Sequence, residues 1–191
     1  MNEPSLFGIG KAQWELINSF GSWLSAIGTL AAVWVSLSLA KRIATPKAKI
    51  TVGHRITIHP GQKGPYPEFV LFSIVNSGER IIRVNQIGWR VGLWRKRFAI
   101  QLYDEGSSSP LPVELSHGQE ARWLVPLNAD KHEPWLQYFA KDMLLPNTRT
   151  SCATLRGQFF TSVGHVFVTK PETALLQKLR TACRAAQQVD G

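Results

Sequence analysis

The spacing of the hydrophobic residues first changes near residue 46 of this chain. Residues 16–40 form a long apolar run, and residues 21–40 contain no charged side chain. A helix of about 20 residues spans the hydrocarbon core of a bilayer, which is roughly 30 Å thick. A buried core helix usually has a polar face, and a signal peptide has positive charge before its apolar run rather than after it. We therefore expect residues 16–40 to form a transmembrane helix.

Charged residues lie unequally on the two sides of this run. Glu3, Lys11 and Glu15 come before it, and no acidic residue follows until Glu68. Positive charge at the end of a span stays on the cytoplasmic side. We expect residues 1–15 to be a short extracytoplasmic N-terminus. The rest of the chain would then lie in the cytoplasm of a bacterial-type cell, at its inner (plasma) membrane.

A basic linker over residues 41–49 follows the predicted span. It contains four positive side chains, those of Lys41, Arg42, Lys47 and Lys49. Basic residues beside a membrane attract anionic lipid by about 1 kcal/mol each. We expect them to contact lipid headgroups, although residues that only set the orientation of the span would look the same.

Small residues recur within the predicted span at intervals of four, three and four positions. They are Gly21, Ser25, Gly28 and Ala32, and this spacing gathers them on one stripe of a helix. In lipid, small side chains let two helices approach closely, and packing drives their association. The stripe indicates self-association, unless it only reflects the small residues that are common in spans.

From residue 50 the hydrophobic pattern has a period of two, which is typical of strands, and segments rich in Gly and Pro separate the extended runs. The predicted strands are 50–58, 69–75, 80–93, 98–103, 111–115, 120–127, 150–162 and 166–170. We expect one hairpin with its tip at 94–97 and another that joins the two strands of residues 111–127. Gly88 suggests a bulge or a close backbone approach.

Two segments have helical spacing instead. Residues 133–144 carry apolar side chains three and four positions apart, with Pro134 at the favoured first turn. Residues 171–186 repeat this spacing after Pro171. We predict a short helix inserted among the strands and an amphipathic helix within the C-terminal segment 171–191.

The predicted fold class is mainly β: a transmembrane helix, an immunoglobulin-like β-sandwich or small barrel over residues 50–170, one short inserted helix and a C-terminal helix. Segment 69–78, FVLFSIVNSG, leads into a strand that contains Trp89. This hairpin-rich pattern resembles the immunoglobulin-like sandwiches behind a single span in many uncharacterised bacterial membrane proteins. Residues 50–170 lack the cysteine pair of antibody domains. The resemblance brings no catalytic residues with it.

Composition adds two facts. The 191 residues have a net charge of +9, of which residues 41–191 carry +10 and the residues before them −1, and they include only two cysteines, Cys152 and Cys183. Small secreted domains that depend on disulfides usually contain more cysteine. We expect two reduced thiols in a reducing compartment, although a single disulfide between them would also fit the count.

No catalytic pattern emerges. The five histidines show no H-x-x-x-H spacing, the serine run 107–109 is not a nucleophile elbow, and residues 8–11 lack the Ser or Thr and the preceding strand of a phosphate-binding loop. The histidines are His54, His59, His117, His132 and His165. We expect no catalytic, metal-binding or cofactor-binding residues and no enzyme activity.

A second basic cluster lies at the predicted hairpin of residues 80–103. It contains Arg90, Arg95, Lys96 and Arg97, near Trp89 and Trp94. These cations could contact the phosphates of a ligand. The strand alternation puts Trp89 on the opposite face from Arg90, as expected for a core tryptophan, so we do not expect nucleic-acid binding.

The expected function is therefore non-enzymatic. The chain would be a single-pass membrane protein that holds an interaction or assembly module at the cytoplasmic face, with self-association or a protein partner. The alternative is a ligand-sensing membrane effector that acts through span oligomerisation, takes a phosphate-rich or nucleotide ligand, and resembles the effectors of cyclic-oligonucleotide anti-phage systems in architecture alone.

Overall fold

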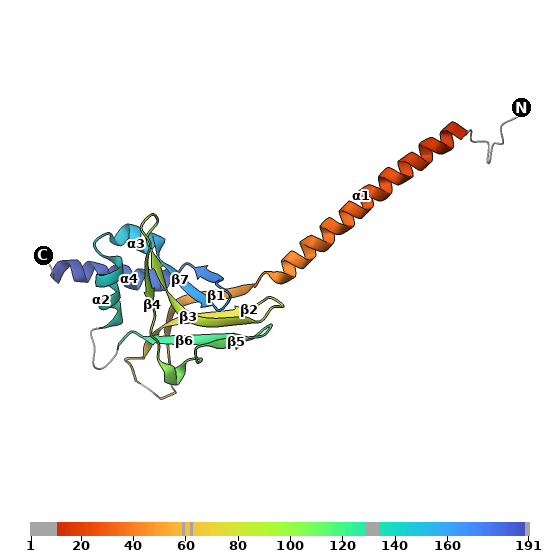
Figure 1. Ribbon diagram of the computed structural model, residues 1–191. Helices are drawn as coiled ribbons and strands as arrows, with labels where there is room; N and C mark the ends of the chain where they lie inside the picture. Colours follow the sequence, from red (N-terminus) through yellow and green to blue (C-terminus); the bar gives the residue numbers. More distant parts are fainter. Residues whose placement is uncertain (1–10, 59, 62, 129–133, 190–191) are drawn as a thin grey trace, which may run out of the picture. The chain divides into compact units, whose positions relative to one another are not determined.

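The computed structural model describes residues 11–58, 60–61, 63–128 and 134–189. The chain divides into two compact units, Met1–Thr45 and Pro46–Gly191 (Figure 1). The first unit contains the 34-residue helix α1 (Lys11–Ala44). Within it, Asn18–Lys41 is long and apolar enough to cross a membrane, with a mean hydropathy of 1.7. The N-terminal apolar helix expected from the sequence is thus present.

The first of two antiparallel sheets has the order β1-β2-β6. Its strands are β1 (Ala48–Ile56), β2 (Glu68–Asn76) and β6 (Glu120–Pro126). Strand β2 is central, which explains why its sequence is an almost continuous apolar run. Val52, Phe72 and Trp123 face one another across the three strands and form part of the core.

The second sheet is built around β3 (Ile82–Val91) and β7 (Arg156–Thr161), with the order β4-β3-β7-β8. Its outer strands are β4 (Arg97–Ile100) and β8 (Val166–Thr169). The short strand β5 (Val113–Leu115) pairs with the beginning of β3.

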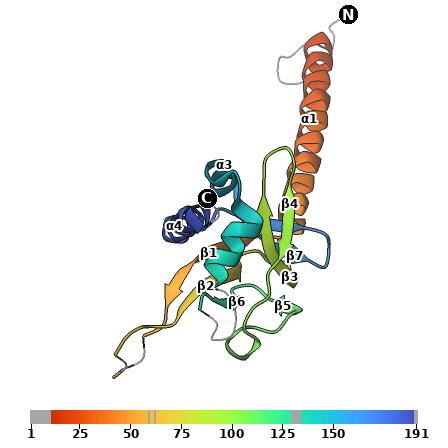
Figure 2. The ribbon, with the colours of Figure 1, turned by 90° about the vertical axis from the view of Figure 1, so that its left-hand side faces the viewer.

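Helical elements occupy the connections and the C-terminus. They are η1 (Glu105–Ser107), α2 (Trp135–Phe139), η2 (Ala140–Leu144), α3 (Thr148–Thr154) and α4 (Thr173–Val189). Figures 1 and 2 show α2, α3 and α4 gathered on one side of the strands. The protein is therefore mixed α/β rather than mainly β, and the expected N-terminal apolar helix and antiparallel strands are present.

Aromatic side chains pack the two sheets together. Phe72 of the first sheet meets Trp89 of the second edge-on, with ring centroids 4.9 Å apart. Phe159 lies 5.8 Å from Phe72 and 6.0 Å from Trp123. All four rings are almost fully buried, so the core lies between the sheets.

A bulge in β3 changes which residues face this core. Val84 is buried at an even position, whereas Ile87 and Trp89 are buried at odd ones. The pairing register with β7 shifts between Val84 and Gln86. One extra residue in a strand reverses the faces beyond it.

Gly88 follows the bulge and is a site of close backbone approach. A Cβ atom at this position would overlap the carbonyl oxygen of Ala99 on the neighbouring strand. One of the two expectations for Gly88 is therefore confirmed, and the bulge itself lies earlier in the strand.

The hairpin predicted over residues 111–127 does not form. Its first arm, β5, pairs with β3 in the second sheet, and its second arm, β6, pairs with β2 in the first. The turn of residues 116–119 therefore crosses between sheets. Two alternating strands joined by a short turn fit either arrangement, and the position of each strand depends on which neighbour buries its apolar face.

The strand predicted over residues 150–162 was wrong in its first part. Residues 150–154 belong to helix α3, and only Arg156–Thr161 is strand β7. Ser151 and Cys152 are buried, and helix α3 packs against α4. Tertiary packing thus overrides the local preference of a segment rich in threonine.

Both predicted helices are present. The first ends in a wider turn, where the amide of Leu145 donates to the carbonyl of Ala140 at 3.0 Å. The second, α4, buries Leu175, Leu179 and Cys183 along one face. The amphipathic spacing of the C-terminal segment is therefore used to cover the core.

Trp89 should be decisive for stability because it joins the sheets and donates through Nε1 to Gln101 at 2.7 Å. We expect Trp89→Ala to lower the free energy of unfolding by about 3–5 kcal/mol. Urea unfolding of the full chain in detergent micelles, followed by far-UV circular dichroism, measures this change.

Trp94→Ala is the matched control, because this tryptophan is 92% exposed. Its loss should change the free energy of unfolding by less than about 0.5 kcal/mol. Equal losses in the two variants would contradict the assignment of Trp89 to the core.

Candidate functional site

The surface of the second sheet that faces away from the core is the main candidate site. Residues directly opposite one another in neighbouring strands present their side chains on the same face. The strand register therefore gives two rows across this surface: Phe98, Arg90 and Arg156, then Ile100, Gly88, Gln158 and Val168. Phe160 and Val166 form a further pair beside them. We call these nine residues the outer face.

The outer face is unusually apolar for an exposed surface. Phe98 is 61% exposed and Ile100 is 64% exposed, and Leu102, just beyond β4, is 82% exposed. On the equivalent surface of the first sheet the most exposed side chains are charged: Arg122 pairs with Glu120 at 2.6 Å, and Ser73 donates to Glu120 at 2.7 Å. The apolar side chains of that surface are only partly exposed: Phe69, Leu71, Val75 and Leu124. Contiguous exposed apolar side chains mark an interaction surface more often than isolated ones do.

Two arginines lie next to each other on the outer face. Arg90 of β3 is directly opposite Arg156 of β7, and like charges in this position repel. Among the described residues neither forms an ion pair with a carboxylate. Arg156 donates to the carbonyls of Ala153 and Leu155, at 3.0 and 2.7 Å. Arg156 therefore has carbonyl partners, and the pair has no counter-charge among the described residues.

Two buried polar atoms of the outer face lack a hydrogen-bond partner within the described structure. They are Nε of Arg90, a donor, and Oε1 of Gln158, an acceptor; Gln158 is only 4% exposed. An unpaired buried polar atom costs about 1–3 kcal/mol. One unpaired donor and one unpaired acceptor therefore lie buried just beneath the outer face.

The β3–β4 hairpin extends from the outer face, and its tip lies beside α3 in both ribbon views (Figures 1 and 2). Gly92 has a positive φ of 101°, which favours glycine, and its amide donates to Oγ1 of Thr154 at 3.1 Å. Leu93 is 72% exposed and Trp94 is 92% exposed. The tip thus presents two large apolar side chains to the surroundings.

The predicted phosphate-contacting residues lie in three different places. Arg95 and Lys96 are exposed at the hairpin tip, and Arg90 lies half-buried on the outer face. The guanidinium of Arg97 donates to the carbonyls of Asp142 and Met143, at 3.4 and 2.8 Å, and so ties the hairpin to η2.

Sequence reasoning missed Arg156 and Gln158. Nothing in the local sequence marks either residue, because their proximity to Arg90 depends on the pairing of β3 with β7. Pairing between strands so far apart in the chain has no local signal.

The predicted span residues Gly21, Ser25, Gly28 and Ala32 are all exposed along α1. A Cβ atom at Gly21 or Gly28 would meet nothing within 4 Å. In the linker, the side chains of Lys41, Lys47 and Lys49 are exposed, and that of Arg42 lies outside the described part of the structure.

The described histidines do not gather into a metal site. No group of three or more His, Cys, Asp or Glu residues that could hold a metal ion occurs in the part of the chain that the structure describes. His117 lies 3.2 Å from the carbonyl of Gly78, and His165 packs edge-on against Phe167. His59 and His132 lie outside the described residues.

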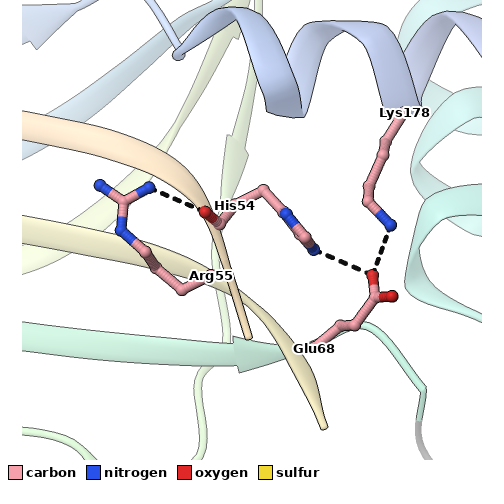
Figure 3. A network of polar contacts seen from close by, with 4 residues as sticks. All are labelled: His54, Arg55, Glu68 and Lys178. Atoms are coloured by element: carbon pink, nitrogen blue, oxygen red, sulfur yellow. Dashed lines mark hydrogen bonds and ion pairs between the residues drawn. The ribbon is translucent and has the colours of Figure 1, made fainter. Parts of the chain in front are cut away.

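A second polar cluster joins helix α4 to the first sheet. The carboxylate of Glu68 lies between His54, at 2.9 Å, and Lys178, at 2.5 Å (Figure 3). On the other side of β1, Arg55 makes two hydrogen bonds to Glu172, at 2.6 and 2.8 Å. Gly53 leaves room for that carboxylate, because a Cβ atom there would overlap it.

These contacts shift the acidity of both carboxylates. Donation by Lys178 holds the pKa of Glu68 below its usual 4.5, and His54 adds to the effect while burial opposes it. Arg55 similarly lowers the pKa of Glu172. The Glu172 pair holds the start of α4 and the Glu68 pair holds its middle, through Lys178, so both pairs tie the helix to the first sheet.

The two cysteines lie near each other. Cys152 of α3 and Cys183 of α4 are both free and fully buried, and burial raises the pKa of both thiols. A buried thiol of raised pKa is a poor nucleophile. This pair belongs to the packing between the two helices.

Comparison with known proteins assigns no family. No family model matches the chain, and no curated protein matches it significantly. The crystal structure of a candidate ApaA protein from Bordetella pertussis is 17% identical with a TM-score of 0.32, covering 68% of this chain and 92% of that one. The solution structure of a candidate late embryogenesis abundant protein is 14% identical with a TM-score of 0.28, covering 91% and 97%. Scores this low support no argument about fold or function.

The ion pairs Glu68–Lys178 and Arg55–Glu172 should make the thermal stability of the folded domain sensitive to acid. A carboxylate whose pKa is lower in the folded state stabilises the protein above the unfolded value, near 4.5, and this contribution is lost as the pH falls through the lowered folded value. We expect Glu68→Gln and Glu172→Gln to lower the melting temperature at neutral pH. The difference from the parent should disappear in acid.

Thermal melts of the full chain in micelles across this pH range test the prediction. Glu105→Gln, in the exposed element η1, is the control and should follow the parent curve. A deficit of the Glu68 and Glu172 variants that persists unchanged in acid would show that their effect is not electrostatic.

Proposed function

We propose that the protein is a non-enzymatic, single-pass membrane protein whose folded domain acts as an interaction or assembly module at the cytoplasmic face. Helix α1 is the observation that carries this proposal. Its apolar segment Asn18–Lys41 has no buried residue within the described structure. A helix that is apolar on all sides needs an apolar environment, and a bilayer supplies one along its whole length.

The orientation follows from charge. Lys41, Lys47 and Lys49 follow the apolar segment, and no acidic residue interrupts them. The positive-inside rule then assigns the folded domain to the cytoplasm and the N-terminus to the outside of an inner, or plasma, membrane. The same basic residues would contact anionic headgroups.

The folded domain is the proposed interaction module. Its two antiparallel sheets with a shared aromatic core are consistent with an immunoglobulin-like sandwich. The outer face of the second sheet carries the two most exposed large apolar side chains of that domain's described strands, Phe98 and Ile100, and is the proposed contact surface. Protein modules on this architecture commonly act by binding rather than by chemistry.

A ligand-sensing membrane effector is the second candidate function. The unneutralised pair Arg90 and Arg156 favours it, because two adjacent guanidinium groups suit a phosphate-rich or nucleotide ligand. Self-association of the span would transmit ligand binding in such a protein. A rise in melting temperature with a nucleotide would support this candidate over the first.

Membrane anchoring is tested by extraction. We expect the full chain to remain in the membrane pellet through high salt and alkaline washes, and to require detergent for release, because residues 18–41 are embedded in lipid. Removal of residues 1–46 should release the folded domain into the soluble fraction.

Orientation is tested in the same cells. A cysteine at Ser107, which is exposed in the folded domain, should be protected from a membrane-impermeant maleimide until the cells are opened. Full-length chain in the soluble fraction would overturn the anchoring, and labelling at position 107 in intact cells would overturn the orientation.

Self-association of the span should depend on its small residues. Gly28→Leu and Ser25→Leu would hold two helices apart, and contacts of this kind are worth about 1 kcal/mol each. Leu30→Ala and Trp34→Ala, on bulkier faces, are the controls and should have smaller effects. A genetic reporter of span association compares the four variants at matched expression. If the Gly28→Leu variant associates as strongly as the parent, the small residues do not mediate self-association.

A further inference from the structure

We propose that the outer face of the second sheet, together with the tip of the β3–β4 hairpin, docks on the surface of an anionic bilayer. The pair Arg90 and Arg156 would bind lipid phosphates, and Leu93 and Trp94 would enter the interfacial region. This inference rests on the proposed membrane anchoring, and it adds a second membrane contact made by the folded domain itself.

The tether keeps the domain near the membrane. Helix α1 ends at Ala44 and β1 begins at Ala48. The connecting residues 45–47 reach at most about 14 Å when fully extended. A span that ends near residue 40 therefore confines the domain to the neighbourhood of the headgroups, where a bilayer is the most abundant surface for it to meet.

The hairpin tip has the chemistry of an interfacial segment. Trp94 and Leu93 are 92% and 72% exposed, and the next two residues, Arg95 and Lys96, are both exposed cations. Tryptophan is enriched at the level of the headgroups, and basic residues beside it are attracted to anionic lipid. Phe98 continues the apolar surface toward the sheet.

The arginine pair fits a phosphate diester. A phosphate between Arg90 and Arg156 would neutralise their repulsion and accept from the terminal nitrogens of the two guanidinium groups. Gln158, on the same face two residues after Arg156, has an unpaired buried acceptor. That acceptor lies below the surface, so the contact with lipid phosphate rests on the two arginines.

A second copy of this chain fits the surface less well. The charged side chains in the outer face and hairpin tip are all basic: Arg90, Arg95, Lys96 and Arg156. Two such surfaces brought together would place like charges opposite one another. The carboxylate of Asp142, near Arg97, is hydrogen-bonded to Tyr138 and does not neutralise the cluster.

A soluble nucleotide or a nucleic acid also fits less well. Such a ligand would satisfy the arginines, but it would leave the aliphatic side chains of Ile100, Val166 and Val168 exposed to water. Bases stack on aromatic rings such as those of Phe98, Phe160 and Trp94, but a stacked base would leave these three aliphatic side chains without an apolar partner. A bilayer accounts for the apolar rows and the cations together.

The experiment uses the full chain in lipid nanodiscs. Leu93→Cys is labelled with an environment-sensitive fluorophore, in discs of phosphatidylcholine alone or with added phosphatidylglycerol, and with or without bromine on the acyl chains. Ser107→Cys, exposed in η1, is the matched control label. We expect a blue shift and bromine quenching at position 93 in anionic discs, and neither at position 107.

Charge removal tests the arginine pair. Arg90→Gln with Arg156→Gln should lower the ratio of docked to undocked domain by about fivefold for each basic residue removed. Arg149→Gln with Arg184→Gln, two exposed arginines elsewhere, is the control and should keep the quenching. If the first double variant loses its cooperative melt, Arg95→Gln with Lys96→Gln, at the exposed tip, replaces it with the same expectation.

Each result decides the question. Insertion into discs with no difference between positions 93 and 107 would overturn the docking and leave the anchoring intact, whereas failure to insert would overturn the proposed function itself. Equal quenching in both kinds of disc would overturn the role of anionic lipid. A response at position 93 to ATP in phosphatidylcholine discs, without one to phosphatidylglycerol, would assign the arginines to a soluble nucleotide and overturn the proposal.

Discussion

The edge-on packing of Phe72 against Trp89 is the contact on which the folded domain depends. It joins β2, the central strand of the first sheet, to β3, one of the two inner strands of the second. Phe159 and Trp123 extend this packing through the core. Trp89 also reaches Phe139 of α2, at 5.1 Å, so the same ring links the sheets to the helical side of the domain. Close packing of this kind fixes which face of each strand is buried.

The outer face is a direct consequence of that constraint. Because Trp89 must point inward, its neighbours Gly88 and Arg90 point outward, and the β3 bulge sets the position at which this alternation begins. Cross-strand pairing then brings Arg156 and Phe98 beside Arg90. Two adjacent arginines without a counter-charge repel each other, and the apolar side chains beside them are exposed to water. Exposed apolar patches of this kind are typical of interaction sites.

The other surfaces of the domain are better satisfied internally. Helix α4 is tied to the first sheet by Glu68 and Glu172, each held by a basic side chain. The edge of β6 is covered by the segment that contains Ser108 and Ser109, whose hydroxyls accept from the amides of Leu124 and Arg122. Covered edges prevent unwanted strand pairing. The outer face differs from these surfaces in its arginine pair, which has no carboxylate partner among the described residues.

Several elements could be predicted from the sequence because their signal lies within a short segment of the chain. The long uncharged run predicted the apolar helix, period-two alternation predicted most of the strands, and the spacing of Leu175, Leu179 and Cys183 predicted α4. The sequence also identified Arg90, Arg95 and Lys96 as a basic cluster. Only the tertiary structure decided the rest: the separation of β5 from β6, the helical form of residues 150–154, and the meeting of Arg90 with Arg156. The physical reason is that each of these depends on which distant segment buries a given face, and contacts between residues far apart in the chain leave no periodic trace in either segment.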